Sequence, residues 1–185
     1  MREKITRRGG TAVEIRLDYG EAPTADQIEE ALEHEEDVKA IAIVYNETST
    51  GVTVRDLPRI GEIARERDIP LLVDAISILG GDRLLVDDWN VDICVAGSQK
   101  CLACPPGLCL ISVSERAWGW IERTGAKPFY YDLTTMRRFQ ARWETPFTPA
   151  IPLLYALEEA LKMVREEGLE RRFERHKACG EAFYG

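Results

Sequence analysis

Apolar residues gather in five short runs along the first two thirds of the chain, at residues 12–17, 39–45, 69–73, 91–96 and 108–113. Each run has the length of a β-strand. In residues 39–45 the apolar positions are continuous and do not alternate with polar ones, which is typical of a strand covered on both faces. We therefore predict five strands, and we expect residues 69–73 to be buried in the same way.

Helical patterns separate and follow these runs. Thr24 and Gln27 have the spacing of a capping box, which predicts a helix through Ile28 and Leu32. We also predict helices over residues 56–67, over about 153–167 and from 169 towards the end, whereas residues 128–152 are aromatic-rich and irregular. Strands that alternate with helices indicate an α/β fold with a mostly parallel sheet flanked by helices.

Composition places this chain among folded globular proteins. It has 185 residues, of which 45% are hydrophobic and 30% charged, enough for one domain or slightly more. The net charge of -8 has the wrong sign for a surface that binds nucleic acid or anionic lipid through charge. We therefore expect no nucleic-acid partner and no binding to an anionic membrane.

The cysteines and the amino-terminal segment favour a reducing compartment. Five cysteines are an odd number, and the first ten residues lack the apolar stretch of a secretory signal, so we expect a cytoplasmic protein. The most apolar segment, residues 93–114, carries Lys100 and contains two prolines, so we predict no membrane span. Cys101 and Cys104 alone do not make a structural zinc site, which needs two ligand pairs, and we predict small buried residues and no metal.

Two charged residues stand alone in apolar sequence, directly after predicted strands. Lys100 is the only charge, cysteines aside, in residues 93–114, and Asp74 is the only charge in residues 69–81. Ligands of parallel sheets collect at the carboxyl ends of the strands, where both residues stand together with the polar residues 46–50. Burial of a lysine without a partner lowers the pKa of its amine, which is how a lysine becomes a nucleophile or forms a Schiff base near neutral pH.

Each of these residues, taken alone, has an ordinary structural explanation. A lysine at the position of Lys100 can snorkel from the end of a buried strand, and Asp74 can be a helix cap or a satisfied acceptor. Together the two residues fit pyridoxal phosphate. That cofactor requires a lysine for a Schiff base and an acid that keeps the pyridine nitrogen protonated, so that the ring can act as an electron sink.

Three segments, with their order and spacing, resemble class V aminotransferases in the branch of the alanine–glyoxylate and serine–pyruvate aminotransferases. They are Asn46-Glu-Thr-Ser-Thr-Gly-Val52, Val73-Asp-Ala-Ile-Ser-Ile-Leu-Gly-Gly81, and Gly97-Ser-Gln-Lys100 followed by Pro105-Pro-Gly107. The similarity extends over nearly the whole chain. It implies the large domain of a fold type I pyridoxal-phosphate transferase, incomplete at both ends. Residues 1–167 are then part of that cofactor-binding domain, and residues 168–185 begin the carboxyl-terminal small domain.

The resemblance also implies the reaction and the residues that carry it. Lys100 forms the Schiff base with pyridoxal 5'-phosphate, and Asp74 pairs with the pyridine nitrogen. Ile76 lies against one face of the cofactor ring. The implied reaction is transamination between a small amino acid, alanine or serine, and a 2-oxo acid, glyoxylate or pyruvate.

Three further residues are implied to bind the cofactor. Ser49 hydrogen-bonds the ring oxygen or groups near it, and Gln99 helps to hold the phosphate. Thr148 resembles the threonine that reaches the phosphate of the neighbouring subunit's cofactor, which implies a homodimer.

Two other functions stay open. Cysteine desulfurases are similar elsewhere but carry a histidine directly before the lysine, where this chain has Gln99, so desulfuration is the less favoured reaction. The second alternative is a non-catalytic remnant or half-protein that dimerises or binds a partner. The chain is expected to begin after the phosphate-binding loop of the family and to end before its substrate-binding arginine, and Thr145 replaces a tyrosine of the relatives.

Overall fold

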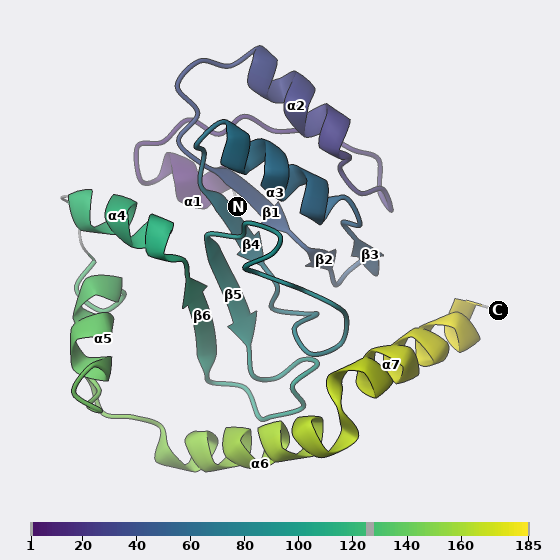
Figure 1. Ribbon diagram of the computed structural model, residues 1–185, viewed down its shortest axis with the longest axis vertical. Coiled ribbons are helices and arrows are strands. Elements are labelled where there is room, and N and C mark those ends of the chain that lie inside the picture. The colour runs from purple at the N-terminus through teal and green to yellow at the C-terminus, as the bar shows by residue number, and fades with distance from the viewer. Residues whose placement is uncertain (1, 125–127, 185) are drawn as a thin grey trace.

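A four-stranded sheet forms the centre of the computed structural model, which describes residues 2–124 and 128–184 (Figure 1). Its strand order is β1-β4-β5-β6, with β1 at Ile41–Val44, β4 at Leu71–Asp74, β5 at Ile93–Gly97 and β6 at Cys109–Val113. The first three strands are parallel, and β6 runs antiparallel to β5. Four of the five predicted strands and the mostly parallel sheet are therefore confirmed.

The prediction of a strand at residues 12–17 is wrong, because that segment has no strand partner in the described chain. Glu14 and Arg16 alternate with apolar residues and lie at the surface, where Glu14 pairs with Arg2. Ile15 packs against the core. The segment thus has one apolar face but no backbone ladder, and only a ladder makes an extended segment a strand.

Two helices cover the part of the sheet that contains the main core. They are α2 at Ala25–Glu33 and α3 at Leu57–Glu66, and they pack against each other and over β1 and β4 (Figure 1). The capping box of α2 is confirmed: the Thr24 hydroxyl accepts from Gln27 N at 3.3 Å, and Gln27 Oε1 accepts from Thr24 N at 3.0 Å. A short hairpin, β2 at Asn46–Glu47 and β3 at Val52–Thr53, follows β1.

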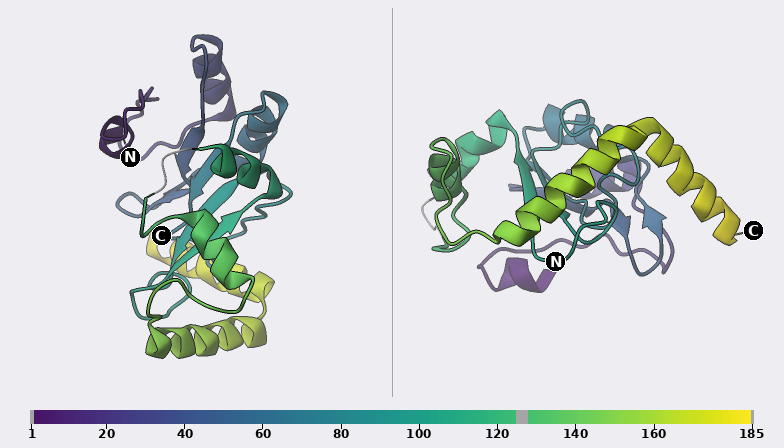
Figure 2. Two further views of the ribbon diagram at one scale, coloured as in Figure 1. Left: turned by 90° about the vertical axis from the view of Figure 1, so that its left-hand side faces the viewer. Right: turned by 90° about the horizontal axis from the view of Figure 1, so that it is seen from below.

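The remaining helices lie outside this core. They are α1 at Arg2–Thr6, α4 at Glu115–Arg123, α5 at Leu133–Gln140, α6 at Ile151–Glu167 and α7 at Leu169–Tyr184. The two long helices α6 and α7 were predicted, and they run across the end of the molecule toward which β4 and β5 point (Figures 1 and 2). The pattern missed α1, α4 and α5 because they bury almost nothing: α1 and α5 have no buried residue and α4 has only Ala117.

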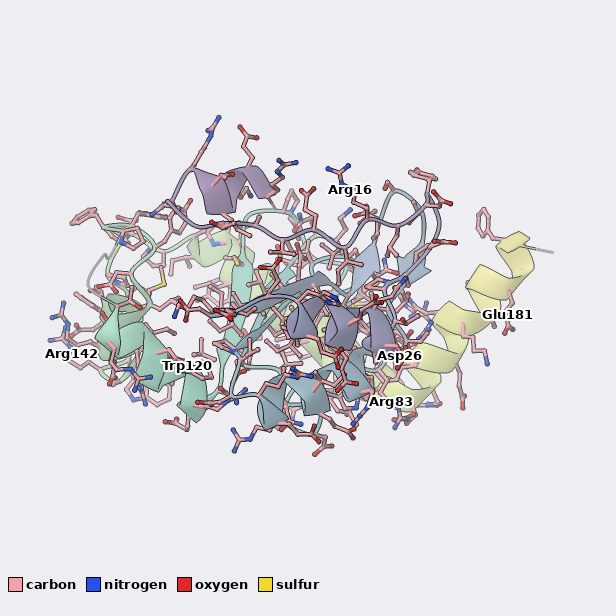
Figure 3. The ribbon with its side chains drawn as sticks, turned by 90° about the horizontal axis from the view of Figure 1, so that it is seen from above. Arg16, Asp26, Arg83, Trp120, Arg142 and Glu181 are labelled. Atoms are coloured by element: carbon pink, nitrogen blue, oxygen red, sulfur yellow. The ribbon has the colours of Figure 1, made fainter. Side chains whose placement is uncertain are left out.

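Charged side chains cover the outside of the molecule. Arg16, Arg142 and Glu181 lie at three different sides of the molecule in this view (Figure 3). In the described part of the chain, no helix is long and apolar enough to cross a bilayer. The break between α6 and α7 falls at Gly168, where residues 1–167 and 168–185 were predicted to divide, and the division into domains stays a prediction.

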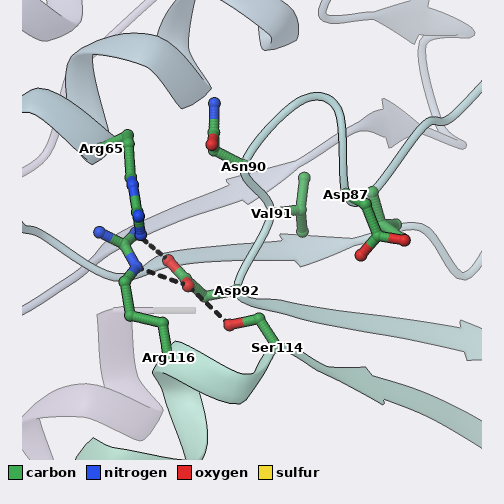
Figure 4. Close-up of a pocket in the computed structure, with 8 residues that line it drawn as sticks. Arg65, Asp87, Asn90, Val91, Asp92, Ser114 and Arg116 are labelled. Atoms are coloured by element: carbon green, nitrogen blue, oxygen red, sulfur yellow. Dashed lines mark hydrogen bonds and ion pairs between the residues drawn. The ribbon is translucent and has the colours of Figure 1, made fainter.

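A buried carboxylate joins the amino ends of β4 and β5 to α4 (Figure 4). Asp92 is only 2% exposed. Its two oxygens accept from Arg116 Nε at 3.0 Å and Nη2 at 2.6 Å, from Leu71 N at 2.9 Å and from Ser114 Oγ at 2.8 Å. A small cavity of about 210 Å³ beside this cluster lies at the amino end of β5, opposite to the edge where Asp74 and Lys100 stand.

We expect Asp92→Ala to lower the free energy of unfolding by about 3–5 kcal/mol, because it removes the buried partner of Arg116, leaving only the exposed Asp68, and the acceptor of Leu71 N and Ser114 Oγ. Urea unfolding followed by circular dichroism measures this change. Asp88→Ala is the matched control, since Asp88 is exposed and lies four residues away in the same segment. We expect that variant to stay within about 0.5 kcal/mol of the wild type. Equal losses in the two variants would contradict the role given to Asp92.

Candidate functional site

Parallel pairing brings the ends of three strands to one edge of the sheet. Val44, Asp74 and Val95 lie side by side in register, each at or near the end of its strand. The loops that leave β1, β4 and β5 therefore meet at this edge. All the polar residues predicted to follow strands, 46–50, Asp74 and 98–100, lie in these loops or at their start.

Asp74 is held at the end of β4 by its own loop. Its Oδ1 accepts from Ile76 N at 3.0 Å, and the side chain is half-buried. Burial, and then the negative charge of Asp74, raise the pKa of the Cys94 thiol to about 11. The same two causes raise the pKa of Cys109. Both cysteines therefore stay protonated near Asp74 at neutral pH, where a thiol is a poor nucleophile.

Ile76 and Gln99 both lie close to the last residue of β5. A Cβ added to Gly97 would lie 3.2 Å from Ile76 Cγ2 and 2.8 Å from Gln99 Oε1. Side chains from the loops after β4 and β5 thus each approach this glycine. Any larger residue at 97 would occupy the space between them. The structure therefore brings together two of the predicted cofactor-binding residues, although what they bind stays a prediction.

Lys100 stands in a loop that a buried serine closes. Ser98 is fully buried; its hydroxyl donates to Pro105 O at 2.7 Å and accepts from Leu108 N at 3.3 Å. The backbone of Ser98 also bonds Leu108 O at 3.1 Å and Cys104 N at 3.0 Å. These four bonds define the lysine loop, residues 98–108, as a closed unit anchored at both ends on β5 and β6.

The structure distinguishes the two interpretations of Lys100. Its side chain is exposed, as expected of a lysine that snorkels from the end of a buried strand, and it is not buried. The reason is that the loop projects beyond the end of β5, so its neighbours Cys101 and Leu102 turn inward while Lys100 does not. In the described part of the chain, its amine makes no ion pair. The predicted isolation of the charge therefore holds, with the side chain exposed.

Ser49 lies in the hairpin after β1 and is bound locally. Glu47 Oε1 accepts from Ser49 N at 2.9 Å and from Ser49 Oγ at 2.8 Å. These bonds lower the pKa of Glu47. Among the described residues, no hydrogen bond joins Ser49 to Asp74 or Lys100. The link between this loop and the loop after β4 is made instead by Asn46, whose Nδ2 donates to Ser77 Oγ at 2.9 Å.

Thr148 lies in the segment between α5 and α6, five residues before Leu153, whose backbone oxygen is 4.0 Å from Cys104 Sγ of the lysine loop. It is exposed and, within the described chain, forms no hydrogen bond with Lys100 or Asp74. Its neighbour Phe147 stacks on Tyr130 at 4.7 Å between ring centroids and contacts Phe129 edge-on at 5.8 Å. Among the described residues, no hydrogen bond therefore links Thr148 to Lys100 or Asp74.

Sequence reasoning missed three residues that shape the site. Ser98 and Ser77 act through backbone carbonyls of the loops, and Arg172 reaches the same loops from α7. The only available signal was the position of the two serines inside the segments that carry the resemblance. Arg172 gave none, because it stands in a highly charged helical stretch.

Comparison with known proteins identifies the family. Residues 2–184 match the family described as Aminotransferase class-V. An uncharacterized aminotransferase of Methanocaldococcus jannaschii is 42% identical over 175 residues, which are 94% of this chain and 45% of the relative. A serine–glyoxylate aminotransferase of Methylorubrum extorquens is 37% identical, over 89% of this chain and 43% of that protein.

The fold agrees with the sequence match. The crystal structure of an alanine–glyoxylate aminotransferase from Nostoc sp. superimposes with a TM-score of 0.92 at 33% identity, covering 98% of this chain and 48% of the other. This chain thus spans about half the length of the relatives that it matches. The predicted fold of the large domain, present in part, is confirmed, and the chain belongs to the class V aminotransferase family.

Proposed function

We propose that this chain carries the cofactor-binding edge of a pyridoxal-phosphate-dependent aminotransferase. The reaction is transamination between alanine or serine and glyoxylate or pyruvate, through a Schiff base on Lys100. One observation carries the proposal: the β4–β5 register sets Asp74 beside the strand whose following loop holds Lys100. The names of the relatives, serine–glyoxylate and alanine–glyoxylate aminotransferase, support the choice of substrates.

The residues at this edge fit the demands of the cofactor. Asp74 is a carboxylate whose Oδ1 is oriented by the Ile76 N–H, and it is suited to pair with a protonated pyridine nitrogen. Ile76 supplies a branched apolar surface for one ring face. Gln99, exposed at the start of the lysine loop, supplies an amide for the phosphate. When bound, pyridoxal phosphate supplies the electron sink for the reaction.

Lys100 has two tasks in this proposal. Its amine would hold the cofactor through the aldehyde group, and the same amine would move the proton at the substrate α-carbon. Both tasks need an amine that is accessible and not held by a carboxylate. The exposure of Lys100 and its lack of an ion pair in the described chain support this role.

Ser49 and Thr148 complete the proposed site. The Ser49 hydroxyl donates to Glu47 Oε1. It can donate to a cofactor oxygen only after this hydrogen bond breaks. Thr148 serves the cofactor of a second copy, as in a homodimer. Exposed aromatic side chains beside Thr148 support a subunit contact there: Phe129 is 87% exposed and Trp143 is 98% exposed.

We expect borohydride reduction after incubation with pyridoxal phosphate to fix the cofactor on Lys100, because its amine is accessible and unpaired. Peptide mass mapping identifies the labelled residue. Lys100→Ala should lose the label, whereas Lys39→Ala should keep it, since Lys39 is an exposed lysine at the opposite edge of the sheet. Label scattered over surface lysines, or retained in Lys100→Ala, would favour a non-catalytic remnant.

We expect Asp74→Asn to keep the Lys100 adduct but to slow proton removal from bound alanine or serine by about 100-fold or more, because an amide does not hold the pyridine nitrogen protonated. The decay of the visible Schiff-base band after addition of the amino acid measures this step. Asp88→Asn is the control and should decay at the wild-type rate. A wild-type rate in Asp74→Asn would remove Asp74 from the proposed mechanism.

A further inference from the structure

Arg172 is a buried arginine on an otherwise exposed helix. It is 7% exposed, and its guanidinium contacts both loops of the candidate site. Nε donates to Gly80 O at 2.9 Å, in the loop that follows Asp74, and Nη2 donates to Cys101 O, one residue after Lys100. One side chain therefore bridges the backbone of the two loops that carry the proposed catalytic residues.

A carboxylate fixes this guanidinium from the other side. Glu167 Oε2 accepts from Arg172 Nη1 at 2.8 Å. Arg175 bonds the same carboxylate, with Nε at 2.5 Å and Nη2 at 3.0 Å. The hydrogen bonds from Arg175 and Arg172 lower the pKa of Glu167 to about 2 although desolvation opposes them, so the carboxylate stays charged at neutral pH. Arg172 is therefore held at a fixed place at the start of α7.

The loops and α7 are in close contact around these bonds. A Cβ added to Gly81 would lie 2.4 Å from Cys101 Sγ and 3.1 Å from His176 Nδ1. His176 stands one helical turn after Arg172, and its Nδ1 is 4.0 Å from Cys101 Sγ. The Cys101 thiol also donates to Ser77 O at 3.2 Å. Cys101 is thus enclosed by the loop after β4 and by α7, and it has little freedom to move.

These contacts give Arg172 a task in the proposed reaction. We propose that Arg172 is a positioning residue that sets the place of Lys100 relative to Asp74 by binding the carbonyls of Cys101 and Gly80 at once. This inference rests on the proposed function. A planar guanidinium presents several N–H groups in a fixed fork, so it can hold two acceptors at a set separation, which a single ammonium group cannot do.

Arg175, an exposed neighbour on the same helix, provides a control that distinguishes this role from stabilisation of the helix alone. Arg175 binds the same Glu167 from the same helix, but its side chain is 52% exposed, compared with 9% for the side chain of Arg172. None of the hydrogen bonds of Arg175 in the described chain reaches the loops of the site. Arg175→Lys is therefore a matched control for Arg172→Lys, since each substitution keeps a positive charge next to Glu167.

The test compares these two variants and Arg172→Met with the wild-type chain. We expect Arg172→Lys and Arg172→Met to weaken pyridoxal-phosphate binding, followed by the visible Schiff-base band, by about tenfold or more. We also expect a lower share of borohydride-fixed label on Lys100 and a changed pH at which the band titrates. Arg175→Lys should match the wild type in all three measurements. Circular dichroism selects conditions in which every variant is folded.

Hydrogen exchange measured without cofactor tests whether Arg172 orders the lysine loop, independently of the proposed function. The peptide that contains residues 98–108 should exchange faster in Arg172→Lys than in the wild type, and should be unchanged in Arg175→Lys. Wild-type labelling of Lys100 in Arg172→Lys, unchanged exchange of that peptide, or equal effects in the two lysine variants would overturn the inference. If the wild-type chain does not label, the proposed function fails, and the exchange measurement still decides whether Arg172 orders the lysine loop.

Discussion

The parallel pairing of β4 with β5 is the constraint on which the site depends. Because the two strands run in the same direction, Asp74 at the end of one comes beside the loop that leaves the other. At their amino ends, Asp92 binds the backbone of Leu71 and holds the starts of both strands together. At their carboxyl ends, Arg172 joins the following loops. A buried ionic group therefore fixes each end of this strand pair.

Much of the fold could be predicted because burial leaves a pattern in the sequence. Strands β1, β4, β5 and β6 and helices α2, α3, α6 and α7 each have apolar positions at the expected spacing. The segment at residues 12–17 has such a pattern as well, yet it forms no ladder. Apolar spacing reports which face is covered, and it does not report whether another strand is available for pairing. Helix α5 has a partly buried apolar face too, with Leu133, Met136 and Phe139, but it is only eight residues long and lies in an aromatic-rich segment, where so short a pattern was not recognised.

The candidate site was predictable only where its chemistry depends on side chains. The isolated charges Asp74 and Lys100 follow strands in the sequence, whereas Ile76 and Gln99 were proposed from the resemblance, and the structure places both of the latter beside Gly97. Ser98 and Arg172 act on backbone carbonyls, which every residue possesses, so their partners leave no trace in the sequence. The sequence left open whether Lys100 is buried or exposed, because apolar neighbours in sequence do not fix which way a loop residue turns.

The thiols around the lysine loop limit which nucleophile is available at this edge. Burial raises the pKa of Cys101, although the positive charges of Arg172 and Lys100 act against it, and burial and Asp74 raise the pKa of Cys94 to about 11. A thiol reacts with an aldehyde or another electrophile as its thiolate, which these cysteines rarely form at neutral pH. The same packing that encloses Cys101 and orders the loop thus keeps this thiol inside, while the side chain of Lys100 remains exposed.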